Sequence, residues 1–280
     1  AMSLLFLLAY QKAQLIIVVT TAAFAFLLAA LAASFVWWIF DMIGIGNYAV
    51  FILLPGVIFQ FLFRCGFVAL YHRVENVIQI SIRNHEEHEN QRTGTQSATA
   101  ADPALSESAR LRLELNDWAC GLAAGTGFGG MHAILLYGTL LASESDNLGT
   151  LYQSSCIGIP ALVISALNTF MFTILDVLWM LLTFFGMRRR RREEASTTLT
   201  GGLGALFGNE KKGGNLALLA VFVSHFCASV ATVFNSGNNG CRISIPVLGI
   251  VTLVTGIVFW AGAAAIYLPA SQQRTSIHRD

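Results

Sequence analysis

Six polar side chains interrupt the long apolar stretches of this sequence. They are Gln60, Arg64, His132, Asn168, Asp176 and His225. Ionisable groups are costly in hydrocarbon, so they usually pair across helices or line a water-filled path. Two interpretations therefore stay open. The first, which we favour, is structural bonding between helices; the second is a path for protons or solutes.

Hydrolytic chemistry has little support in the sequence. Intramembrane aspartyl proteolysis needs two carboxylates that share a proton, but only Asp176 lies well inside an apolar stretch, and Asp41 lies at a boundary. The histidines at the ends of His85-Glu-Glu-His88 are too close for the HExxH zinc motif, and the polar surroundings indicate solvation. We therefore predict no catalytic, cofactor-binding or metal-binding residue.

Three glycines recur at intervals of four residues in another apolar stretch: Gly121, Gly125 and Gly129. On a helix this spacing places them on one face, where a second backbone can approach closely. The pattern predicts a helix-packing surface. Its partner is either a helix of the same bundle, which we favour, or another protein.

The composition defines the fold class. The chain of 280 residues is 55% hydrophobic and only 12% charged, and it contains several apolar runs of at least 20 residues, which is the length of a membrane span. We predict an all-α polytopic transmembrane helix bundle, forming a single domain over 1–280. Complete spans are expected at 13–40, 48–71, 118–142, 156–187, 215–235 and 243–268. Residues 1–12 are too short to span and are interpreted as a partial span or else as a short interfacial segment.

The basic residues predict the orientation. Fifteen of the 17 lysines and arginines fall on one side: Lys12 and 14 residues in the predicted loops 72–117 and 188–214 and the tail 269–280. Such an excess marks the cytosolic side, so the C-terminus should be cytosolic. The opposite, oxidising side would hold Cys156 and Cys241, which could form a disulfide. Packing is the default expectation for the cysteines.

Several of these segments resemble the anterior-pharynx-defective (APH) family, a seven-span subunit of gamma-secretase. The series Gly121, Gly125, Gly129 resembles the glycine motif of the family's fourth span. Residues 34–40 and 60–64 resemble the second and third spans, with Arg64 at the arginine of the third. Residues 224–225, 232–235 and 245–246 resemble the sixth span, the turn after it and the start of the seventh. The likeness covers about 12–268 and would make 1–12 the remnant of a first span.

One departure concerns a histidine in the family's fifth span. This chain has Asn168 in the matching pattern Leu167-Asn168-Thr169-Phe170, whereas an alternative register would place Asp176 there. We prefer Asn168 because its flanking residues match. His225 falls on the family's sixth-span histidine, and its depth leads to the hypothesis that a neutral His225 bonds to Asn168, with Asp176 as a competing partner.

The resemblance implies a function without catalysis. It implies a scaffold subunit of a presenilin-type intramembrane aspartyl protease that binds presenilin, nicastrin and the presenilin enhancer subunit, in a complex that processes Notch-like and amyloid-precursor-like substrates. It also implies a location in endoplasmic reticulum, Golgi, endosomal and plasma membranes. No cofactor and no nucleic acid is expected. The alternative is a small transporter or channel that uses the buried polar residues.

Overall fold

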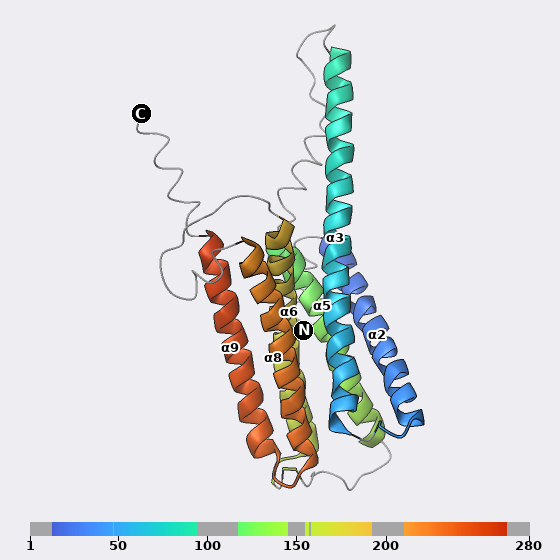
Figure 1. Ribbon diagram of the computed structural model, residues 1–280, viewed down its shortest axis with the longest axis vertical. Helices are drawn as coiled ribbons and strands as arrows, with labels where there is room; N and C mark the ends of the chain where they lie inside the picture. The colour runs from blue at the N-terminus through green and yellow to red at the C-terminus, as the bar shows by residue number, and fades with distance from the viewer. Residues whose placement is uncertain are drawn as a thin grey trace.

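The computed structural model describes residues 13–46, 48–93, 117–144, 155–156, 158–191 and 210–267 (Figure 1). The expected partial span at 1–12 and the tail 269–280 lie outside these residues. The described regular elements are six α-helices and one 3-10 turn: α2 (Ala13–Met42), α3 (Ala49–Thr93), α5 (Asp117–Glu144), α6 (Ala161–Arg191), α8 (Glu210–Val233), η1 (Phe234–Ser236) and α9 (Cys241–Tyr267).

All six helices are long and apolar enough to cross a membrane, and each overlaps most of one predicted span, with ends that differ by up to five residues except at the C-terminal end of α3. This confirms the polytopic helical bundle. The helices run alternately up and down, so their connections gather at two ends (Figure 1). We call the end that holds Arg188, at the top of Figure 1, the arginine end. The opposite end, where Cys156 and Cys241 lie, is the disulfide end.

α3 is longer than the sequence led us to expect. The loop predicted from residue 72 starts later, because α3 continues to Thr93 and projects beyond the other helices (Figure 1). Its 45 residues correspond to about 68 Å at 1.5 Å per residue, more than twice the hydrocarbon thickness. No glycine or proline occurs between 72 and 93, and Gly94 follows, so nothing local stops the helix earlier.

Two apolar cores share the helix α6. The first joins α2, α3 and α5 to one side of α6, where Phe128 and Met180 are fully buried. The second joins α8 and α9 to the other side, around the fully buried Trp179 and Leu248. α6 therefore lies between two sets of helices, and its orientation fixes both.

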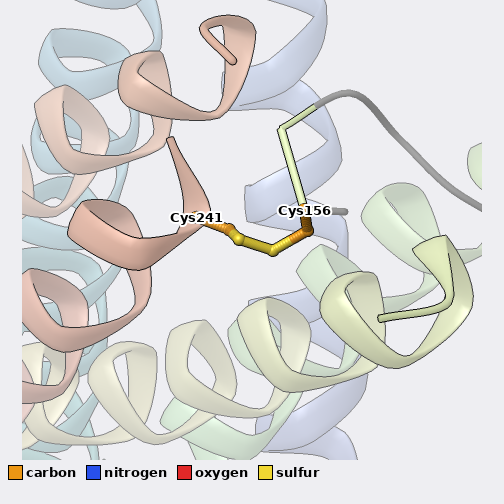
Figure 2. The surroundings of a disulfide bond; sticks show 2 residues. All are labelled: Cys156 and Cys241. Atoms are coloured by element: carbon orange, nitrogen blue, oxygen red, sulfur yellow. A yellow bond between two sulfur atoms is a disulfide. The ribbon is translucent and has the colours of Figure 1, made fainter. Parts of the chain in front are cut away.

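A disulfide joins Cys156 to Cys241 at the disulfide end (Figure 2). Cys156 precedes α6 and Cys241 begins α9, with their Cα atoms 5.6 Å apart. The Cys241 amide also donates to the Ser155 carbonyl at 3.1 Å. The two cysteines are 85 residues apart in the sequence, so the disulfide closes a long covalent loop. Such a loop strongly restricts the conformations of the unfolded chain. The sequence left this pairing open, and the structure shows that the two cysteines are bonded.

The orientation leads to the first prediction. Because disulfides persist in oxidising compartments and basic residues concentrate on the cytosolic side, we expect the arginine end to face the cytosol. Tags with a protease cleavage site, inserted at Gly208 and after Asp280, should both be cleaved when only the cytosolic face of sealed vesicles is exposed to the protease. A tag at Gly237, next to the disulfide, serves as the control and should be protected. Protection of either of the first two tags would contradict the orientation.

Candidate functional site

The centre of the bundle contains a buried ion pair. Arg64 on α3 donates from Nη2 to Oδ1 of Asp176 on α6, and both side chains are 0% exposed. An isolated charge at this depth would carry a desolvation penalty of several kcal/mol, and a charged partner offsets much of it. The sequence-predicted residues Arg64 and Asp176 are therefore structural partners of each other.

Two histidines extend this pair to two further helices. His132 on α5 bonds through Nδ1 to Oδ2 of Asp176 at 2.8 Å. The Nδ1 atom of His225, on α8, lies 3.3 Å from Nη1 of Arg64. We call Arg64, Asp176, His132 and His225 the charge cluster. It links α3, α5, α6 and α8, so four of the six described helices meet at one polar centre.

Aromatic rings surround the guanidinium group. The Arg64 Cζ atom lies 5.2 Å from the ring centre of Phe128 and 4.9 Å from that of Trp179. Trp179 also packs on His225 with ring centres 4.4 Å apart, and its Nε1 donates to Ser224 Oγ at 2.7 Å. Cation–π contacts are stronger away from water, so these rings stabilise the charge where solvent is excluded. Sequence reasoning missed Trp179, since a tryptophan in an apolar span looks like ordinary core.

The hypothesis that His225 bonds to Asn168 is wrong. His225 bonds to Arg64 instead, and the Oδ1 atom of Asn168 is buried without a hydrogen-bond partner among the described residues. Asp176 does not contact His225 either, because Arg64 lies between them. The pairing of His225 with Asn168 was suggested by their similar depth in the membrane. The rotation of α6 instead directs Asp176, which lies two turns after Asn168, toward Arg64.

A cavity of about 340 Å³ adjoins the charge cluster. It is lined by residues of α3, α5, α6 and α8, among them Gln60 and His225, and by Asn235 of the 3-10 turn η1 near the disulfide end. Gln60, His132 and Asn168, three of the polar residues singled out from the sequence, line it. Gln60 also accepts a hydrogen bond from Arg64 Nη2 at 3.4 Å. The six predicted polar residues thus divide between the cluster and the adjoining cavity.

The glycine series lies against α6 of the same chain. We call Gly121, Gly125 and Gly129 the glycine seam. A Cβ atom added at Gly125 would lie 2.6 Å from the Cα of Val177, and one at Gly129 would lie 3.0 Å from the Thr173 carbonyl oxygen. Real Cβ atoms essentially never show the first distance, and the second would require the neighbour to shift, so this close crossing favours glycine at both positions. Of the two partners considered, this face therefore contacts the chain's own bundle.

A second polar cluster lies at the arginine end. Arg188 on α6 donates from Nε to Asp117 at 2.6 Å and from Nη2 to Glu75 at 2.9 Å, thereby joining α5 and α3. His72 bonds to the same Glu75 at 3.2 Å. The potential ligand atoms of His72, Glu75 and Asp117 lie within 4.8 Å of one another, and the guanidinium group of Arg188 forms ion pairs with both carboxylates. We interpret the cluster as a clamp between helix ends.

These features define a multi-pass integral membrane protein whose helices meet at a buried charge cluster. A family model described as Aph-1 protein matches residues 1–265, and the chain belongs to this family. Aph-1 is a non-catalytic gamma-secretase subunit family, so the resemblance found in the sequence is confirmed. No curated protein and no solved structure gives a significant match to the chain.

The glycine seam gives the second prediction. Gly125→Leu places a branched side chain against the α6 backbone, and overpacking of this kind costs about 1–3 kcal/mol. We expect a lower thermal unfolding midpoint and increased proteolysis of the detergent-solubilised chain. Gly130→Leu is the matched control, because a Cβ atom at Gly130 on the same helix meets nothing within 4 Å. Equal losses in the two variants would point to general helix damage and contradict the seam.

Proposed function

We propose that this chain is the scaffold subunit that supports assembly of a presenilin-type intramembrane aspartyl protease. Its partners would be presenilin, nicastrin and the presenilin enhancer subunit, and the complex would process Notch-like and amyloid-precursor-like membrane substrates. The observation that carries the proposal is the Aph-1 family match over 1–265, since this is a gamma-secretase subunit family. The proposed location is the endoplasmic reticulum, Golgi, endosomal and plasma membranes.

The state of Asp176 supports a non-catalytic role. Aspartyl proteolysis needs two carboxylates that share one proton next to water and substrate. Here both oxygens of Asp176 are engaged, one by Arg64 and the other by His132, and the side chain is fully buried. No second aspartate or glutamate contacts it in the described part of the chain. Asp176 is therefore suited to hold helices together.

The internal fastening of the bundle supports a scaffold role. The glycine seam, the charge cluster, the clamp at Arg188 and the disulfide each join helices of the same chain. A rigid bundle can present a fixed outer surface to other transmembrane helices and loses less conformational entropy on binding than a mobile one. We propose that the seam and the buried polar residues contribute to assembly indirectly, by maintaining this surface.

The third prediction separates a scaffold from a catalytic subunit. In cells that lack their own Aph-1 protein, the tagged chain should restore intramembrane proteolysis and co-purify with the other subunits in fixed stoichiometry. Asp176→Asn leaves Arg64 without its counter-ion, so the yield of complex should fall. Proteolysis per purified complex should nevertheless stay within about twofold of the wild type.

Two results would contradict the proposal. Loss of activity per complex in Asp176→Asn, at normal subunit stoichiometry, would indicate that Asp176 takes part in the chemistry. Solute flux through the chain reconstituted alone, together with no co-purifying subunits, would favour the transporter or channel considered from the sequence. Gly130→Leu serves as a control variant for expression and purification, because its added side chain meets open space.

A further inference from the structure

The cavity next to the charge cluster presents two imidazole nitrogens that the cluster does not use. His132 and His225 both line the cavity, and each contacts the cluster through Nδ1 alone. Their Nε2 atoms have no hydrogen-bond partner among the described residues. The scaffold role does not require these nitrogens, so their chemistry can be considered separately.

The cluster fixes which of the two nitrogens donates. A guanidinium group can only donate, so Nδ1 of His225 must accept from Arg64, and the proton of the neutral ring is then on Nε2. The carboxylate of Asp176, paired with Arg64, accepts from Nδ1–H of His132. A neutral imidazole that donates from Nδ1 has a lone pair on Nε2. His225 therefore presents an N–H donor to the cavity, and His132 presents a nitrogen acceptor.

The rest of the lining is uncharged and has two kinds of surface. Among the residues that the structure describes, no aspartate, glutamate, lysine or arginine lines the cavity, and Arg64 and Asp176 behind it neutralise each other. Leu53, Leu136 and Phe172 supply apolar wall. On the polar side, Asn168 and Thr169 have side-chain oxygens with no partner in the described structure. Such a lining gives little attraction to an ion and suits a molecule that is apolar on one side and polar on the other.

We propose that this cavity is a binding site for an uncharged amphiphile with a hydroxyl group. The hydroxyl accepts from the His225 Nε2–H or donates to the His132 Nε2, and the apolar body lies against Leu53, Leu136 and Phe172. A hydroxyl provides both a donor and an acceptor without a charge, which matches the two imidazoles. The volume of about 340 Å³ is within the range of small-molecule sites. The hydroxyl can belong to a membrane sterol or to a small soluble alcohol.

The test uses the full-length chain in its native complex, in phosphatidylcholine nanodiscs. Two diazirine photolabels are applied separately, a photoreactive sterol and a photoreactive octanol, and the labelled peptides are identified by mass spectrometry. We expect adducts on the cavity-lining parts of α3 and α6. Labelling by the sterol supports a lipid source and labelling by the octanol supports a soluble one. Absence of adducts in the lining with both labels would overturn the proposal.

Cavity-filling variants keep the test independent of folding. Gly56 lines the cavity and an added Cβ atom would meet nothing within 4 Å, so Gly56→Leu should fill the space while leaving the charge cluster intact. Gly66→Leu on the same helix is the control, because it also meets open space but does not line the cavity. Labelling should fall at least tenfold in Gly56→Leu and stay unchanged in Gly66→Leu, with thermal midpoints equal to that of the wild type.

The hydroxyl requirement is tested with labels of matched shape. Replacing the hydroxyl of each label by a methyl group should lower the labelling of the lining by about tenfold, the effect of losing one well-formed hydrogen bond. A carboxylate analogue of the octanol should label even less, because no cationic group lines the cavity. Equal labelling with and without the hydroxyl, or undiminished labelling of Gly56→Leu, would overturn the proposal.

Discussion

The bundle depends on how one buried arginine is neutralised. A guanidinium group in hydrocarbon needs a counter-ion and hydrogen-bond acceptors, and Arg64 finds them in Asp176 on α6, His225 on α8 and Gln60 one turn earlier on its own helix. The contacts with Asp176 and His225 each specify a rotation and a depth for the helix that provides them. Apolar side chains pack almost equally well against lipid and against other helices, so apolar packing does not fix how the helices are rotated. The polar centre therefore selects one helix arrangement among many that bury a similar apolar area.

The glycine seam and the charge cluster depend on each other. α5 and α6 run antiparallel, and the seam allows their backbones to approach where Gly125 faces Val177 and Gly129 faces Thr173. Side chains on a helix tilt toward its N-terminus, so His132 and Asp176 lean toward each other across this close crossing. The 2.8 Å bond between them is thus a consequence of the small residues one turn away. Sequence positions that look unrelated therefore form one structural unit.

The sequence predicted the spans and the polar residues better than it predicted their partners. The length of an apolar run indicates directly whether it can span a membrane, so all six helices could be predicted. The four-residue spacing of the glycines likewise indicated one helix face. Pairing was harder, because it depends on helix rotation, which depth along a span does not reveal. Asn168 and His225 were matched by depth and are not bonded, whereas Arg64, which was noted among the buried polar residues without a specific partner, is the central donor.

Features in the polar segments were the hardest to predict. The segment after His72 was interpreted as loop because of its polarity, yet its lack of glycine and proline allows α3 to continue to Thr93. The clamp of Arg188 with Glu75 and Asp117 was missed for a related reason. Its members lie just beyond the apolar runs, and the local signal is only an acidic residue beside each of two spans and an arginine at the end of a third.

The most direct test of this account is a double-mutant cycle on Arg64 and Asp176, measured as the free energy of reversible unfolding in mixed micelles. Arg64→Leu and Asp176→Leu should each cost about 3–5 kcal/mol, because each leaves one buried charge unpaired. The double variant should cost much less than the two losses together, since no unpaired charge remains. Additive losses would mean that the two charges act independently, and would contradict a bundle organised around their pairing.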